Sequence, residues 1–263
     1  MALSTEIRNQ LAKALYDAEQ NREPIPPLSE THPDIDMEDA YAIQLEGIRL
    51  RTGGDTSKII GWKVGLTSKA VQQMLGVDQP DFGHLLDHTR IDEGEEIKTG
   101  EMIWSRIEPE IAFELSADLK GPGVTADDVM KATAYLIPAL EVVDSRVKDW
   151  KIKIWDTVAD NASCGRFVLG KSRTKPDGIN MQLIGMNFYV DGNLTSTATS
   201  AAVIGNPADA VAWLANTLAP YGHYLRAGQV IMPGSLVAMV DAKPGGQIRA
   251  EFDHIGSVEA KLA

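Results

Sequence analysis

The sequence predicts an α+β fold with a helical N-terminal portion and a strand-rich body. In residues 5–20, apolar residues recur at helical spacing behind Ser4, a typical helix cap. Residues 38–51 repeat this pattern and stop at Gly53. From about residue 81 onward, strands and turns prevail with few β-α-β alternations, which favours α+β over a doubly wound sheet. We therefore expect a largely helical N-terminal cap over 1–80 and a strand-rich domain over 81–263.

The remaining segments follow from turn and capping residues. Residues 24–36 are rich in proline and predict a loop. Asp191-Gly192 lies between two alternating segments and predicts a hairpin. The other predicted elements are a strand over 58–65, a short helix over 68–75, strands over 103–115 and 135–145, a helix capped by Thr125, and a helix from Asn206 to Gly222.

Bulk properties exclude several classes of protein. The chain has 263 residues and a net charge of −12 without a basic cluster, which disfavours nucleic-acid binding. No apolar run is long enough to span a membrane, and the N-terminus does not resemble a secretory signal. Cys164 is the single cysteine, so an internal disulfide and a thiolate zinc site are excluded. We expect a cytoplasmic protein that binds neither nucleic acid nor membrane.

Two acidic residues stand on one face of an apolar strand, "SRIEPEIAFEL". Residues two apart on a strand share a face, so Glu108 and Glu110 point one way and Ile107 and Ile111 the other. A solvent-facing strand face would explain the pair equally well. Pro109 lacks a backbone donor, which predicts that the strand is at an edge or interrupted there.

A third carboxylate makes a solvent-facing role less satisfactory. Glu141 lies within the apolar run "IPALEVVDS", where a charged group is costly unless it is paired. Three carboxylates brought together repel one another, and a hard divalent cation removes that repulsion. An Mg²⁺ or Mn²⁺ site with open positions suits chelation of an α-oxo acid, on which the metal acts as a Lewis acid.

Several long motifs together resemble a known family. They are "GWKVGLTSKAVQQMLGVDQPDFG", "RIEPEIAFEL", "IPALEVVDSR", "DTVADNASCGRFVLG" and "GNPADAVAWLANTL". In this order, over nearly the whole chain, they resemble the fumarylacetoacetase superfamily and within it the bacterial 2-hydroxypenta-2,4-dienoate (2-oxopent-4-enoate) hydratases. The resemblance implies a mixed β-roll core, a homo-oligomer, and Mg²⁺ or Mn²⁺ held by Glu108, Glu110 and Glu141.

The resemblance also assigns catalytic roles to two residues that are ambiguous on their own. Lys63, in a short apolar strand, would otherwise be interpreted as a surface lysine, and Asp81 as a turn-capping aspartate. Family hydratases place the corresponding lysine beside the metal and an acid facing the substrate. The related 2-oxo-3-hexenedioate decarboxylases tend to carry an apolar residue in place of the acid, so Asp81 favours hydration.

Polar residues near these motifs are weaker candidates for substrate binding. Asp160, Asn161 and Ser163 form a cluster that turn and cap chemistry also explains. The alternative is that they bind the substrate carboxylate or orient a metal-bound water. Ser68 and Ser235 are further candidates of the same kind.

The predicted reaction is hydration of 2-hydroxypenta-2,4-dienoate to 4-hydroxy-2-oxopentanoate in meta-cleavage degradation of aromatic compounds. Alternatives are a 2-oxo-3-hexenedioate (4-oxalocrotonate) decarboxylase on the same scaffold and a hydratase for a longer 2-oxo dicarboxylate. A non-catalytic partner of the pathway decarboxylase is a further possibility, and hydratases of this family can form a complex with that enzyme. A carbon–carbon hydrolase is disfavoured because no His–Glu pair can be assigned as its water-activating dyad.

Overall fold

Helices come first in the chain and strands dominate the remainder, as predicted. The computed structural model describes residues 2–68, 72–73 and 76–263. The helices are α1 Thr5–Asn21, α2 Leu28–Thr31, α3 Met37–Thr52, α5 Ala126–Ala132, α6 Ile154–Ala159 and α7 Pro207–Leu218. The strands are β1 Ile59–Gly65, β2 Asp81–Leu86, β3 Arg90–Asp92, β4 Glu96–Ile97, β5 Ser105–Leu115, β6 Thr133–Asp144, β7 Cys164–Leu169, β8 Gly185–Val190, β9 Asn193–Thr199, β10 Val230–Met232, β11 Val240–Asp241, β12 Gln247–Phe252 and β13 Gly256–Leu262. Across the described ranges, no helix is both long and apolar enough to cross a membrane.

The helix ends coincide with the predicted capping residues. The Ser4 hydroxyl accepts a hydrogen bond from Ile7 N at the start of α1, and Gly53 ends α3 in the left-handed conformation. Thr125 forms a capping box at the start of α5, and Asn206 caps α7. These caps satisfy backbone groups that the helix leaves free. The end of α7 differs from the prediction: it lies at Leu218, and a 3-10 turn over Ala219–Tyr221 separates it from Gly222.

Two predicted segments are not simply confirmed: one differs from the prediction and the other lies mostly outside the described residues. The proline-rich segment 24–36, predicted to be a loop, contains the one-turn helix α2. It forms because Ser29 N and Oγ donate hydrogen bonds of 2.9 and 2.7 Å to the buried carboxylate of Asp156 in α6. The helix predicted over 68–75 lies mostly outside the described residues.

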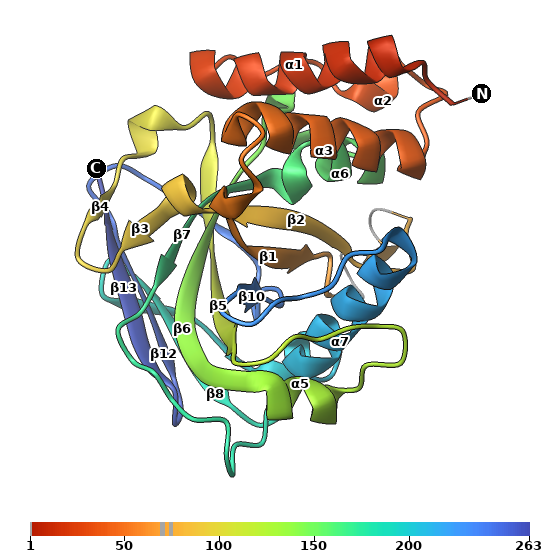
Figure 1. Cartoon of the computed structure of the whole chain (residues 1–263). Helices are drawn as coiled ribbons and strands as arrows, with labels where there is room; N and C mark the ends of the chain where they lie inside the picture. The colour runs from red at the N-terminus through yellow and green to blue at the C-terminus, as the bar shows by residue number, and fades with distance from the viewer. Residues whose placement is uncertain (1, 69–71, 74–75) are drawn as a thin grey trace.

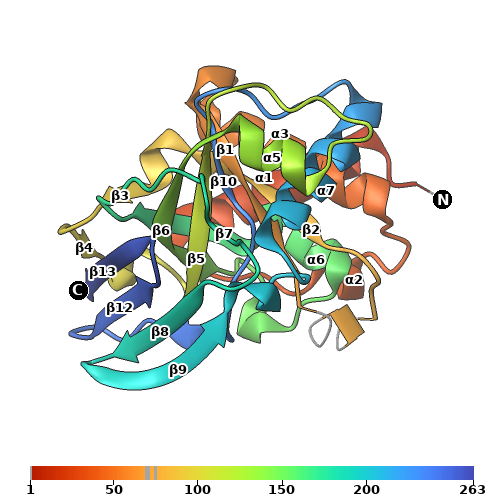
Figure 2. The ribbon, with the colours of Figure 1, turned by 90° about the horizontal axis from the view of Figure 1, so that it is seen from below.

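The strands form two sheets of mixed direction, as the predicted mixed core requires. The eight-stranded sheet has the order β2-β1-β10-β5-β6-β7-β3, with β11 also paired to β5; the five-stranded sheet has the order β4-β13-β12-β8-β9. β1 pairs with β10, and β3 with β7, in parallel, whereas β5 and β6 are antiparallel. Figure 1 shows α1, α3 and α6 stacked at one end of the strands, and Figure 2 shows β8, β9, β12 and β13 along another side.

The predicted hairpin at Asp191-Gly192 is present. It joins β8 to β9, with Val190 opposite Asn193. The pair extends the five-stranded sheet, in which β9 is the last strand.

Strand β1 belongs to the larger sheet although it precedes residue 80. It pairs with β10 on one side and β2 on the other. The division at residue 80 stays a prediction, but the strand-rich body already includes Ile59–Gly65 and therefore Lys63.

Pro109 lies inside the larger sheet and not at its edge, so that part of the expectation is wrong. On one side Pro109 is opposite Leu140 of β6. On the other side β5 has no strand partner at this residue, because β11 pairs near Ile107 and β10 near Phe113; β5 itself is not interrupted as the prediction allowed. The missing N–H of Pro109 is tolerated at this gap, where its carbonyl accepts a 3.3 Å hydrogen bond from Leu236 N.

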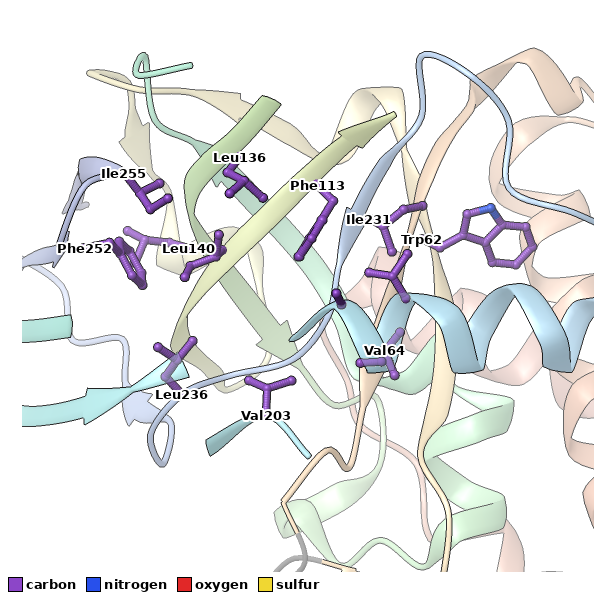
Figure 3. Packing of buried hydrophobic residues seen from close by; sticks show 14 of the residues in the cluster. Trp62, Val64, Phe113, Leu136, Leu140, Val203, Ile231, Leu236, Phe252 and Ile255 are labelled. Atoms are coloured by element: carbon purple, nitrogen blue, oxygen red, sulfur yellow. The ribbon is translucent and has the colours of Figure 1, made fainter. Parts of the chain in front are cut away.

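The two faces of β5 have the environments that its two-residue period predicts. Ile107, Ile111 and Phe113 are buried in the main hydrophobic core. Figure 3 shows Phe113 in this core with Leu140 of β6 and Ile231 of β10. The opposite face carries Glu108 and Glu110, followed by a smaller apolar cluster that begins at Ala112.

The helical layer holds β2 in place through one buried amide. Gln44 Nε2 of α3 donates to Phe82 O of β2 at 3.0 Å and to Val158 O of α6 at 2.7 Å. Buried main-chain carbonyls need such donors. This contact joins the N-terminal helices to the strand that begins with Asp81.

Candidate metal and substrate site

Three glutamates from two neighbouring strands converge on one side of the larger sheet. In the register of β5 and β6, Glu108 is directly opposite Glu141, and Glu110 lies two residues along β5 on the same face. One carboxylate oxygen from each lies within 4.8 Å of the others. Glu110 and Glu141 are fully buried, and Glu108 is half-buried. The predicted grouping of these three residues is therefore present.

Hydrogen bonds satisfy only part of this cluster. Glu110 Oε2 accepts a 2.8 Å hydrogen bond from Gly234 N. Glu110 Oε1 and both oxygens of Glu141 are buried without a hydrogen-bond partner in the described part of the chain. Burial, together with the neighbouring Glu141, raises the pKa of Glu108 to about 7 and that of Glu110 well above its usual value. Unpartnered carboxylate oxygens held this close are the donor set that a hard divalent cation prefers, so the residues fit the predicted ion.

Lys63 supplies a positive charge to the cluster from β1. Its Nζ lies 3.2 Å from Glu141 Oε1 and donates a 2.8 Å hydrogen bond to Ala162 O. The residue is 3% exposed, which excludes a surface role. Burial alone would lower the pKa of Lys63, but the negative charges of Glu141 and Asp81 outweigh it and raise that pKa. Lys63 is therefore a buried ammonium.

Asp81 can approach Lys63 because Gly65, the residue opposite Asp81 on β1, has no side chain. Asp81 is opposite Gly65 in the antiparallel pair of β1 and β2. A Cβ on Gly65 would lie 2.2 Å from Asp81 Oδ1 and 3.4 Å from Lys63 Nζ. Asp81 Oδ2 accepts a 3.4 Å hydrogen bond from Thr157, while Oδ1 is buried with no partner among the described residues. Burial raises the pKa of Asp81 although Lys63 opposes the shift.

The polar cluster 160–163 lies against the site, but two of its side chains already have protein partners. The Asp160 carboxylate accepts hydrogen bonds from the backbone and the guanidinium of Arg146. The Asn161 amide bonds to His84 N and His84 O at 2.7 and 3.0 Å. Ser163 differs, because its Oγ is buried without a partner within the described ranges. A substrate contact by Asp160 or Asn161 would require breaking these bonds, whereas Ser163 is free to make one.

The other two serine candidates are neighbours in the chain of Gly234 and Thr67, which pack together near Glu110. Ser235 Oγ donates to Val237 O at 2.8 Å, next to Gly234, which bonds Glu110. Ser68 is half-buried, immediately after Thr67. Thr67 packs on Gly234, since a Cβ there would lie 2.1 Å from Thr67 Oγ1.

Sequence reasoning did not identify Ala162, Thr157 or Arg146 as parts of this site. Ala162 contributes only a carbonyl, and Thr157 contacts Asp81 across a long separation in the chain. Arg146 was visible only as a basic residue downstream of Glu141. Gly65 could have been identified from the sequence, because a glycine within an apolar strand often marks a place where another group approaches the backbone closely.

Comparison with known proteins is consistent with this geometry. Residues 59–263 match the model of the fumarylacetoacetate (FAA) hydrolase C-terminal family. The chain belongs to this family. The predicted resemblance is thereby confirmed.

Relatives with hydratase names cover most of the chain. The chain is 51% identical to a 2-hydroxypent-2,4-dienoate hydratase of Pseudomonas putida over 81% of its length and 96% of that protein. It is 46% identical to a 2-hydroxyhexa-2,4-dienoate hydratase of Comamonas testosteroni, over 92% of both. The solved structure of a 4-oxalocrotonate decarboxylase from Pseudomonas putida G7, complexed with magnesium and adipate, superposes with a TM-score of 0.95 at 35% identity, covering 99% of both chains.

The raised pKa values predict a pH-dependent response to divalent cations. Because the pKa of Glu108 rises from its ordinary value to about 7 on folding, the metal-free fold loses stability as pH rises toward 7. A cation replaces the protons, so Mg²⁺ or Mn²⁺ should raise the melting temperature more at pH 8 than at pH 5.5. Thermal unfolding with EDTA or with metal at both pH values measures this. Equal increments at the two pH values, or an undiminished increment in Glu141→Gln, would contradict the assignment.

A methyl group at position 65 should displace Asp81. In Gly65→Ala the Asp81 carboxylate must rotate away, which the fold survives because only a side-chain end moves. A displacement of about 1 Å costs on the order of 100-fold in rate, so turnover should fall at least about tenfold. The matched control is Gly185→Ala on β8, where a Cβ meets nothing within 4 Å. Similar turnover in both variants would show that the close approach is unimportant.

Proposed function

We propose that the chain is a metal-dependent hydratase that converts 2-hydroxypenta-2,4-dienoate (2-oxopent-4-enoate) to 4-hydroxy-2-oxopentanoate in meta-cleavage degradation of aromatic compounds. The observation that carries the proposal is one buried site in which three glutamates, an ammonium and a carboxyl with a free oxygen lie together. Hydratase relatives at 46–51% identity support the reaction class.

Glu108, Glu110 and Glu141 would hold the cation, with Mg²⁺ or Mn²⁺ as the proposed ion. Their oxygens are hard ligands, and the magnesium in the related decarboxylase structure supports this choice. When bound, such an ion supplies Lewis acidity to the 2-oxygen of a chelated 2-oxo acid.

Lys63 stabilises the negative charge that develops on the substrate oxygen. Glu141 and Ala162 O hold its ammonium in place, so no reorganisation is needed when charge appears. An ammonium has three donors; Ala162 O accepts from one of them, and the ion pair with Glu141 leaves at least one for the substrate.

Asp81 moves the protons. The dienol first loses the proton of its 2-hydroxyl and gains one at C5, giving 2-oxopent-3-enoate; water then adds at C4, and C3 takes up a proton as the attacking water loses one. The raised pKa of Asp81 keeps its carboxyl able to hold and release a proton nearer neutral pH than an ordinary aspartate. Oδ1 is the atom available for this transfer, since it has no partner within the described chain.

Ser163, Ser68 and Ser235 are the hydroxyl groups proposed to contact the substrate carboxylate; Ser235 would first have to release its hydrogen bond to Val237 O. Asp160 and Asn161 remain candidates only through their backbone or after rearrangement, because their side chains bond to Arg146 and His84. Assembly into a homo-oligomer, a complex with the pathway decarboxylase and a cytoplasmic location stay predictions from the sequence.

The second candidate is 4-oxalocrotonate decarboxylase, favoured by the near-complete superposition on that enzyme. The longer-dicarboxylate hydratase is a further alternative. One assay separates these activities: absorbance of the dienol is followed with purified protein, with and without EDTA, and CO₂ release is measured from 2-oxo-3-hexenedioate. Metal-dependent dienol decay without CO₂ release supports the five-carbon hydratase. CO₂ release supports the decarboxylase, and the absence of both supports the partner-subunit alternative.

Replacing Asp81 should abolish most hydration without affecting the metal site. In Asp81→Asn the group can no longer take up a proton, and general acid–base catalysis contributes about 100-fold or more. Turnover should fall by that factor, while Mn²⁺ affinity, measured by calorimetry, should stay within about twofold. Asp92→Asn on exposed β3 is the control. Near-normal turnover of Asp81→Asn would remove this residue from the mechanism.

A further inference from the structure

The second partner of Lys63 is a main-chain carbonyl in an unusual turn. Asn161, Ala162 and Ser163 have φ values of 53°, 50° and 55°. Three consecutive non-glycine residues in the left-handed region are disfavoured for L-amino acids, and such a segment persists only where its surroundings hold it. Ala162 O, which accepts the Lys63 hydrogen bond, is in the middle of this turn.

Arg146 holds both ends of the turn. Its Nη2 donates to Asp160 O, and its Nη1 donates to Cys164 O at 3.0 Å. These two carbonyls directly precede and follow residues 161–163. The Nε of Arg146 pairs with the Asp160 carboxylate, and Arg146 is 1% exposed. All three guanidinium nitrogens are therefore engaged within the protein.

The other side of the turn is held by β2. The side chain of Asn161 bonds both backbone groups of His84. A Cβ on Gly83 would lie 2.5 Å from Asn161 O, so the turn lies directly against this strand. Arg146 and β2 thus hold the turn from two directions.

We propose that Arg146 is a positioning residue for catalysis. By fixing the carbonyls on either side of residues 161–163, it holds Ala162 O in place and, through that carbonyl, the ammonium of Lys63. It acts without touching the substrate or the glutamates. This inference rests on the catalytic role of Lys63 proposed above.

The geometry requires an arginine, because one planar fork reaches two carbonyls and a carboxylate at once. A lysine keeps the charge opposite Asp160 but cannot make all three contacts. If Arg146 served only to neutralise Asp160, the conservative substitution would leave turnover per folded molecule unchanged. The two explanations therefore predict different kinetics for Arg146→Lys.

The test compares Arg146→Lys with a matched control, Arg8→Lys. Arg8 forms a 2.7 Å pair with the buried carboxylate of Asp39 in the helical layer, away from the turn. In Arg146→Lys, kcat should fall at least about tenfold, because small displacements of a catalytic group are costly. The Kd for Mn²⁺ and the KM should stay within about twofold. Arg8→Lys should lower the melting temperature but leave kcat within about twofold of the wild type.

Three outcomes would overturn the proposal: kcat of Arg146→Lys within twofold of the wild type, equal losses of kcat in both variants, or loss of Mn²⁺ affinity in parallel with kcat. If Arg146→Lys does not fold, the isosteric variant Asp160→Asn replaces it in the test. We expect its kcat to fall about fivefold, and an unchanged kcat would contradict the proposal.

The variant Lys63→Met distinguishes failure of the proposed function from failure of this inference. Near-normal turnover of Lys63→Met would remove the proposed catalytic role of Lys63. Loss of turnover in Lys63→Met together with normal turnover in Arg146→Lys would remove only the positioning role of Arg146.

Discussion

Repulsion among buried carboxylates is the constraint on which this structure depends. Glu108, Glu110, Glu141 and Asp81 lie around one ammonium, that of Lys63. Within a buried site this imbalance must be met by protons or by a cation. The antiparallel register that sets Glu108 opposite Glu141 creates the constraint, since a slip of one residue would turn the acids toward the hydrophobic core.

The rest of the fold brings compensating groups to that point. β1 contributes Lys63, and Gly65 on the same strand lets the carboxyl of Asp81 approach it. The helical layer contributes no charge to the site but holds β2 through Gln44. The interruption of the sheet at Pro109 leaves room for the loop whose Gly234 N bonds Glu110. Lys63 and Gly234 therefore contact the glutamates directly, whereas the helical layer acts on the site only through β2.

The sequence predicted the parts of this arrangement that follow from local periodicity. The two-residue spacing of β5 identified the shared face of Glu108 and Glu110, and the cost of a charge in an apolar run singled out Glu141. Residues 24–36 were predicted to be a loop from their prolines, and helix α2 was missed because Asp156, the partner of Ser29, is remote in sequence. Pro109 was expected at the edge of the sheet or at an interruption because the sequence shows only that proline lacks an N–H donor. It does not show that the neighbouring strand has a gap beside this residue. Arg146 was not identified as a site residue because two of its contacts are to backbone carbonyls, which any residue type can provide, and its ion pair with Asp160 depends on the fold of the turn.

Fold alone does not choose between hydration and decarboxylation, because a decarboxylase structure superposes at a TM-score of 0.95. The glutamates and Lys63 would serve either reaction, since both develop negative charge on the 2-oxygen. Hydration additionally requires protons delivered to carbon and taken from water. In the proposed mechanism Asp81 takes this part, because its pKa is raised, one of its oxygens has no partner within the described structure, and it does not belong to the group of three glutamates that would hold the cation. On this proposal, the choice of reaction depends on whether Asp81 can exchange a proton with the substrate.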